Sequence, residues 1–232
     1  MAVDVLEELL LHIDRLTVQD IQCLAEVQDV DWFSRLRNLR PELAVQEIRC
    51  LLEDSSCTSV FLEHVLWLYC WLVSRQKIGP WILFRFGASA LQIDFNTLLG
   101  NVARAMRSLG RPVFLRVQRD CGTYYGCMIS NRSDPITRKR EVVFVVLWSD
   151  QRFAAAYAGT NEQQRTLMTC LHIALNGESV ELLQGLHADL NDAFRAACRD
   201  VAPTLHRLDR DPNIPALFFA NGDLREQAEE QF

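Results

Sequence analysis

The chain has 232 residues, enough for one large domain or two small ones with a sizeable buried core. Hydrophobic residues make up 49% of it and charged residues 23%, a composition typical of globular proteins that excludes a largely disordered chain. The net charge is −6, no apolar run approaches the roughly 20 residues of a membrane span, and the acidic start MAVDVLEELL lacks the basic region of a secretory signal.

The N-terminal region predicts consecutive short helices. Apolar residues between Val5 and Leu16 recur at helical spacing. Thr17 and Asp20 form a pattern typical of the cap that opens a second helix. Pro41 suits the first turn of a further helix, because a helix start needs no backbone donor there. The apolar face of that helix is expected to comprise Leu43, Val45, Ile48, Leu51 and Leu52.

Two apolar segments complete this helical region. The stretch 59–73 is apolar almost all round, which predicts a central buried helix. Residues 80–86 predict the last helix of the bundle. Several short helices in so few residues imply an antiparallel bundle with short connections.

The pattern changes after a predicted hinge at 87–89. Asp94 is a typical cap for a helix that ends at Gly110. Alternating or β-branched runs then predict strands joined by hairpin turns, at 113–118, 123–130, 142–148 and 152–157. A helix, a short strand and a second helix are predicted at 161–175, 179–183 and 188–200. Little regular structure is expected after Pro203.

These elements predict an α+β protein with a mostly antiparallel sheet. The expected organisation is a helical domain over 1–87, a domain of helices and sheet over 94–203, and an irregular acidic tail over 204–232.

Positive charge is concentrated in the middle of the chain. Residues 1–90 carry a formal charge of −5, residues 91–165 carry +5 and residues 166–232 carry −6. Lys77 and Lys139 are the only lysines, so this positive charge is almost entirely arginine, which can bind phosphate groups in a bidentate manner. We therefore expect an anionic partner to bind the middle segment.

The eight cysteines are predicted to be reduced core thiols of an intracellular protein, because no secretory signal precedes them and most lie in apolar stretches. No two of them form a CxxC pair. Cys121 and Cys127 lie six residues apart on a predicted hairpin, and we interpret them as buried packing residues rather than metal ligands. The sequence therefore predicts neither a metal site nor a cofactor.

Catalytic signatures are missing from the sequence. The glycine-rich loops that bind nucleotide phosphates, GxGxxG and GxxxxGK[ST], do not occur, and none of the five histidines suggests a partner for a nucleophilic Ser or Cys. The acidic residues Glu7 and Glu8 suit the first turn of a helix. We therefore expect a binding protein without a small-molecule substrate rather than an enzyme.

Two groups of basic residues are candidate contacts for nucleic-acid phosphates. Arg138, Lys139 and Arg140 lie in a polar connection between two predicted strands, where the alternative interpretation is a solvated hairpin tip. A second group, on one face of the helix that ends at Gly110, consists of Arg104, Arg107 and Arg111.

The order of elements resembles the inner-kinetochore CENP-N (centromere protein N) family. HIDRLTVQDI is similar to the family's first helix junction, LAVQEIRCLLED to its following amphipathic helix, and WLYCWLVSRQKI to its central helix. VFVVLWSDQRFAAA is similar to its central hairpin, and TCLHIALNGESVELLQGLHADLNDAF to its closing helix–strand–helix. Together these stretches cover about residues 5–200.

This resemblance implies a bundle of pyrin or death-fold character followed by a sheet domain of the CENP-N/CENP-L homology type. It implies a nuclear protein of the constitutive centromere network, active in chromosome segregation, that recognises CENP-A nucleosomes and binds CENP-L and other centromere subunits, with no membrane partner. In the family, an acidic side chain of the first helix reads a histone loop while basic side chains bind the nearby DNA.

Individual residues match these family roles by position. Glu7 corresponds to the histone-reading residue, and its place beside the apolar face leads us to expect a free carboxylate. The DNA-facing residues implied by the resemblance are Arg15, Arg40, Lys77, Arg138, Lys139 and Arg140.

Other family positions have changed. Val3, Leu10 and Leu11 stand where charged residues are usual, Pro41 replaces a basic residue, and His187 stands in the place of an arginine. Fewer phosphate contacts imply weaker and less salt-sensitive DNA binding. The alternative interpretation is a kinetochore adaptor of the same fold that no longer binds nucleosomes or DNA. The family's C-terminal part, which pairs with CENP-L, extends beyond residue 232, so we expect a shortened chain or a short family member.

Overall fold

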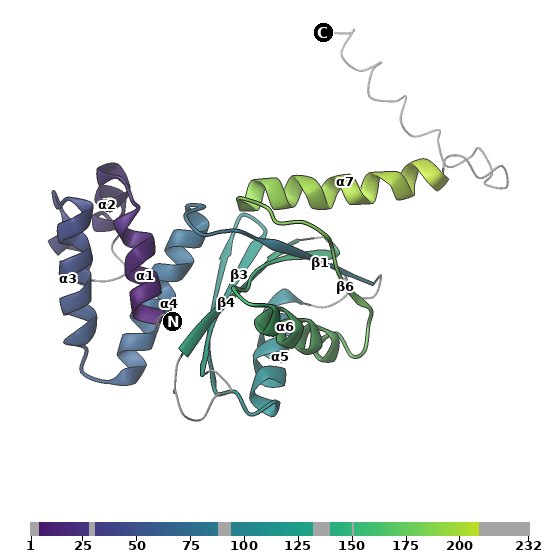
Figure 1. Ribbon diagram of the computed structural model, residues 1–232, viewed down its shortest axis with the longest axis horizontal. Coiled ribbons are helices and arrows are strands. Elements are labelled where there is room, and N and C mark those ends of the chain that lie inside the picture. Colours follow the sequence, from purple (N-terminus) through teal and green to yellow (C-terminus); the bar gives the residue numbers. More distant parts are fainter. Residues whose placement is uncertain (1–4, 28–30, 88–93, 132–139, 150, 209–232) are drawn as a thin grey trace, which may run out of the picture. The chain divides into compact units, whose positions relative to one another are not determined.

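The computed structural model describes residues 5–27, 31–87, 94–131, 140–149 and 151–208, and these residues form seven α-helices and a six-stranded antiparallel sheet (Figure 1). The predicted α+β class is confirmed. The chain divides into two compact units, residues 1–193 and 194–232. The first unit contains every described element except most of the last helix, α7 (Leu190–Leu208).

The first unit begins with a helical bundle. Its elements are α1 (Val5–Asp14), α2 (Val18–Ala25), the short 3-10 helix η1 (Asp31–Leu36), α3 (Pro41–Glu53) and α4 (Thr58–Ser74). The predicted caps are confirmed, since Thr17 and Asp20 form a reciprocal capping box before α2 and Pro41 is the first residue of α3.

The helix α4 is the central helix of the bundle, as predicted, and residues 65–73 are buried without interruption. The Tyr69 hydroxyl donates a hydrogen bond to the carbonyl of Val5 at 3.1 Å and so ties α1 to α4.

The buried face of α3 differs from the prediction. Ala44, Ile48 and Leu52 are buried, whereas Leu43 is 50% exposed. Three apolar positions one turn apart are enough to bury this helix on one side, so Leu43 lies outside the contact.

A single sheet follows, with strand order β2-β3-β4-β5-β1-β6. The strands are β1 (Ile82–Phe86), β2 (Val113–Asp120), β3 (Thr123–Asn131), β4 (Arg140–Trp148), β5 (Phe153–Tyr157) and β6 (Val180–Leu182). Strands β2 to β5 lie where the sequence predicts them. Cys121 and Gly122 form the two-residue turn between β2 and β3, with φ of 44° and 79° as a type I′ turn requires.

The helix predicted over 80–86 is wrong, because this segment contains strand β1. It pairs with β5 on one side and β6 on the other. The segment is almost continuously apolar, and four of the five residues of the strand are buried, with Arg85 as the exception. Such a run has no periodicity that distinguishes it from a buried helix.

Helices cover both faces of the sheet (Figure 1). On one face, α5 (Phe95–Ser108) and α6 (Asn161–Ala174) close the main hydrophobic core. On the other face, α4 packs against β2 and β3, and the rings of Tyr69 and Phe144 lie 5.7 Å apart. The hydroxyl of Tyr157 on β5 also donates to Glu8 of α1 at 2.6 Å. Bundle and sheet thus share the first compact unit, and the domain boundaries at 87 and 94 stay a prediction.

The last helix is longer than predicted. We expected a helix over 188–200 and irregular structure after Pro203, but α7 continues through Pro203 to Leu208. The rest of the predicted acidic tail, 209–232, lies outside the described residues.

Candidate nucleic-acid interface

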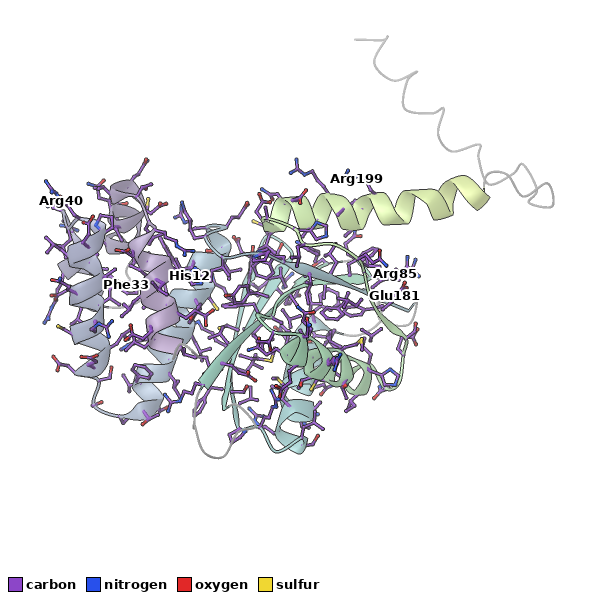
Figure 2. All side chains as sticks on the ribbon, in the orientation of Figure 1. His12, Phe33, Arg40, Arg85, Glu181 and Arg199 are labelled. Atoms are coloured by element: carbon purple, nitrogen blue, oxygen red, sulfur yellow. The ribbon has the colours of Figure 1, made fainter. Side chains whose placement is uncertain are left out.

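Three of the predicted DNA-facing residues lie at one end of the helical bundle. The helices α1 and α4 end there and α3 begins there, beside α2 (Figure 1). Arg15 follows α1, Arg40 is the N-cap of α3, and Lys77 follows the C-cap of α4. All three are exposed, and Figure 2 shows Arg40 at this end of the bundle.

Lys77 is held at this surface by Asp20. Its Nζ lies 2.9 Å from Oδ2 of Asp20, which also accepts hydrogen bonds from the backbone N–H and the hydroxyl of Thr17. Burial alone would raise the pKa of the Asp20 carboxyl, but the hydrogen bonds from Lys77 and Thr17 lower it below its usual value. This ion pair joins the α1–α2 connection to the end of α4, and so brings Arg15 and Lys77 to one surface.

Two further arginines, which sequence reasoning missed, extend this surface. Arg37 follows η1, and Arg75 is the C-cap of α4 with its guanidinium 5.8 Å from the ring centre of Trp71. A signal was available, because the segment SRLRNLRP places three arginines close together in a region that is acidic overall. We call this surface the basic end, and it comprises Arg15, Arg37, Arg40, Arg75 and Lys77.

Most cations of the basic end are available for a partner. Within the part of the chain that the structure describes, no carboxylate pairs with Arg15, Arg37 or Arg40. The neighbouring Arg35 differs, because it lies 3.8 Å from Glu47. An exposed arginine without an ion pair keeps its charge and its donors for a phosphate group.

Glu7 is exposed, but the expectation of a free carboxylate is wrong. Arg49 of α3 binds both of its oxygens, with Nη1–Oε1 at 2.6 Å and Nη2–Oε2 at 2.9 Å. The hydrogen bonds from Arg49 lower the pKa of Glu7 below its usual value. A histone arginine would therefore have to displace Arg49 from this carboxylate.

Arg111 does not belong to an exposed basic face. The chain leaves α5 at Gly110, which has a φ of 78°, so Arg111 lies beyond the helix. Its side chain is buried and binds Glu141 of β4 at 2.5 Å and Glu162 of α6 at 3.1 Å. Gln163 donates to the second oxygen of Glu141 at 3.0 Å. We call this network the Arg111 corner, and it makes Arg111 a structural residue.

The other two arginines of the predicted face are only partly available. Arg104 is exposed and donates to Oδ1 of Asn101 at 2.7 Å. Arg107 donates to the carbonyl of Val113 at 3.0 Å. The prediction of a phosphate-binding face made by Arg104, Arg107 and Arg111 is therefore wrong. Arg111 is buried in ion pairs, and Arg107 already donates to a backbone carbonyl.

The predicted basic loop is only partly visible. Arg138 and Lys139 lie outside the described residues. Arg140 opens β4 and is half-buried, with its guanidinium 5.9 Å from the ring centre of Phe61. Because Phe61 lies in the first turn of α4 and Lys77 follows its end, these positions are about 24 Å apart at 1.5 Å per helical residue. Arg140 therefore does not join the basic end.

The cysteines are less buried than predicted. Cys70, Cys127 and Cys170 are buried, but Cys50, Cys57, Cys121 and Cys198 are exposed. The packing role predicted for Cys121 is wrong, because Cys121 lies in an exposed turn. Cys127 instead contacts Cys70 of α4, and burial raises the pKa of the Cys127 thiol. Among the described residues, no group of three or more His, Cys, Asp or Glu side chains could hold a metal ion.

Comparison with known proteins gives no assignment. No protein-family model matches the chain, and no curated protein matches it. None of the helices in the described ranges is long and apolar enough to cross a membrane.

Proposed function

We propose that the protein is a non-enzymatic scaffold of the inner kinetochore that binds CENP-A nucleosomes, with the basic end contacting DNA phosphates. The partner comes from the resemblance to the CENP-N family, and the contact surface comes from the geometry of the bundle. The pyrin-like character of the bundle, the CENP-N/CENP-L homology type of the sheet, the nuclear location and the CENP-L partner belong to the same proposal.

The observation that carries the proposal is the gathering of Arg15, Arg37 and Arg40 without carboxylate partners, among the described residues, at one end of the bundle. Arginines that serve stability are paired or packed, as Arg111 is. Exposed arginines collected on one surface instead suit a polyanion, since each phosphate that they neutralise releases counterions from the DNA.

Lys77 and Arg140 are proposed as weaker contacts. Lys77 has to share its charge with Asp20, which reduces its attraction for phosphate. Arg140 would form a second DNA contact at the opposite end of α4, where it could reach a separate part of DNA that curves around a nucleosome. Arg138 and Lys139 are proposed as DNA contacts from the resemblance alone.

Glu7 is proposed as the histone contact, with a histone arginine replacing Arg49 as the partner of its carboxylate. The pair with Arg49 is half exposed on both sides, and exposed ion pairs are weak. A histone arginine can therefore replace Arg49 at little cost, provided that Arg49 finds Glu53, which already lies 3.7 Å away.

The test is a polarisation assay on reconstituted CENP-A and ordinary nucleosomes. The triple variant Arg15→Ala, Arg37→Ala, Arg40→Ala should bind both less tightly, and its salt slope should fall by up to about 0.9 for each phosphate that the variant no longer neutralises. The matched control is Arg165→Ala, an exposed arginine of α6, which should leave the slope unchanged. Glu7→Gln should weaken binding to CENP-A nucleosomes alone, by about ten-fold.

One observation favours a second function. The ion pair with Arg49 is by itself a structural role for Glu7. Glu7 therefore also suits a kinetochore adaptor of the same fold that does not bind nucleosomes. In that case the wild type should bind neither type of nucleosome, and the triple variant should behave like the wild type.

A further inference from the structure

Strand β2 is a long open edge of the sheet. It has eight residues and, among the described residues, it pairs with β3 alone. The opposite edge, β6, has three residues and carries an ion pair between Arg85 and Glu181, which Figure 2 shows across β1 and β6. A short, charged edge strand such as β6 is protected against further pairing. Strand β2 is charged but long, so its length does not protect it.

The register identifies the backbone groups that face outward. Asp120 and Thr123 flank a two-residue turn, so they form a hydrogen-bonded pair and the pairs alternate from there. The backbone groups of Leu115, Val117 and Arg119 therefore point away from β3. The hydrogen bond from Arg107 to the carbonyl of Val113, the next residue of this set, agrees with this assignment.

These outward groups make no hydrogen bond within the part of the chain that the structure describes. Within the described ranges, neither another backbone group nor a side chain makes a hydrogen bond to the N–H or carbonyl of Leu115, Val117 or Arg119. The side chains of Leu115 and Val117 pack against the core beneath α5. The strand is therefore packed on the face toward α5, and its outer edge has backbone donors and acceptors that no described residue uses.

The side chains around this edge are mostly basic and apolar, but Asp120 ends the strand and the charge of Arg119 acts on Asp94. Arg116 and Arg119 have no carboxylate within 4 Å among the described residues, and the buried Nε of Arg116 lacks a hydrogen-bond acceptor. Phe114 is 44% exposed on the same strand. A strand added here would meet Arg116 and Phe114 on one face of the sheet and Arg119 on the other.

We propose that β2 binds an extended segment of another protein, which carries acidic residues on both of its faces, as an added strand of the sheet. The backbone of the segment would pair with Leu115, Val117 and Arg119, and its carboxylates would pair with Arg116 and Arg119. A second copy of this chain is the less suitable occupant, because its β2 strand would bring two further arginines to an edge that already carries two. This inference does not depend on nucleosome binding.

The test uses a library of synthetic peptides of about ten residues, in which two Glu or Asp residues three positions apart lie among Val, Ile, Leu or Tyr, so that each face carries one carboxylate. Binding to the full chain is measured by polarisation, and hydrogen exchange identifies the protected amides. The best peptide should slow exchange at Leu115, Val117 and Arg119. The same peptide with alternate backbone nitrogens methylated should lose about ten-fold or more in affinity, because strand pairing needs those donors.

A charge reversal provides the second readout. Arg116→Glu with Arg119→Glu should weaken the acidic peptide by about ten-fold or more and strengthen a peptide with Lys in place of Glu. Arg165→Glu on α6 is the matched control and should change neither affinity. No binding by any library member at about 1 mM would overturn the proposal and leave the arginines as protection of the edge. Equal binding by the methylated peptide, or a dimer of the free chain protected at the same amides, would overturn it as well.

Discussion

The basic end and the Arg111 corner contain the same type of side chain in opposite surroundings. At the basic end, Arg15, Arg37 and Arg40 are exposed and have no carboxylate partner among the described residues. At the corner, Arg111 is 6% exposed and binds two glutamates. Burial of a charge is costly unless it is paired, so the corner has to satisfy its arginine while the basic end does not.

The difference shows that the net charge of a segment does not identify a binding surface. The middle segment carries +5, yet Arg107 and Arg111 are used within the fold. The first ninety residues carry −5, yet they contain the basic end. What decides availability is the distance from each arginine to the nearest carboxylate or carbonyl, which depends on the fold.

Removal of the buried arginine should have the largest effect on stability. Arg111→Met leaves Glu141 without its main partner and should lower the free energy of unfolding by about 3–5 kcal/mol. Denaturant unfolding followed by circular dichroism measures this loss. Arg165→Ala, on the exposed side of α6, should stay within about 0.5 kcal/mol of the wild type. A loss below that level in Arg111→Met would mean that the corner contributes little.

A smaller loss is expected in the helical bundle. Tyr69→Phe removes the hydrogen bond that the hydroxyl donates to the carbonyl of Val5 and so loosens the tie between α1 and α4. The free energy of unfolding should fall by about 1 kcal/mol. Because this hydrogen bond lies at the start of α1 and the basic end lies at the end of α1, DNA affinity should not change in the same assay used for the arginine variants. A matching fall in affinity would show that the orientation of α1 controls the interface.

Local chemistry made much of the fold predictable. The caps at Thr17, Pro41 and Asp94, the helix end at Gly110, and the Cys121–Gly122 turn all depend on residues within a few positions of each other. Strand β1 could not be predicted in this way, because its partners Ala154 and Leu182 lie far along the chain.

The site was less predictable for the same reason. Arg111 meets glutamates that are 30 and 51 residues away, and Glu7 meets an arginine 42 residues away. No local pattern contains these pairs. Arg37 could have been predicted, because it lies in the short segment between η1 and α3, only three residues from Arg40. The close spacing of arginines in the sequence indicates this exposed basic segment.

Release of Lys77 should strengthen the basic end. Asp20→Asn removes the charge that pairs with Lys77 at 2.9 Å, so Lys77 becomes free for a phosphate. We expect tighter DNA binding and a salt slope steeper by about 0.9, the value for one additional neutralised phosphate. Lys77→Ala in the same background should cancel the gain. An Asp20→Asn variant with unchanged slope would place Lys77 outside the interface.

The same carboxylate predicts a small pH dependence of stability. The pKa of Asp20 is lower in the folded state than its ordinary value of 3.8. Its contribution should therefore be complete above pH 3.8 and should be lost as the pH falls through the folded pKa. The difference in unfolding free energy between wild type and Asp20→Asn should shrink in acid. A difference that stays constant to low pH would mean that the carboxylate is not held in this ion pair.

The most direct measurement compares salt slopes for duplex DNA between two triple variants. One replaces Arg15, Arg37 and Arg40 by alanine, and the other replaces Arg104, Arg119 and Arg165, which are exposed arginines of the middle segment. If the basic end binds DNA, the slope of the first variant should fall by about 0.9 for each phosphate contact that its three arginines make in the wild type. The slope of the second variant should stay at the wild-type value. A slope that falls in the second variant and not in the first would contradict the assignment of DNA binding to the basic end.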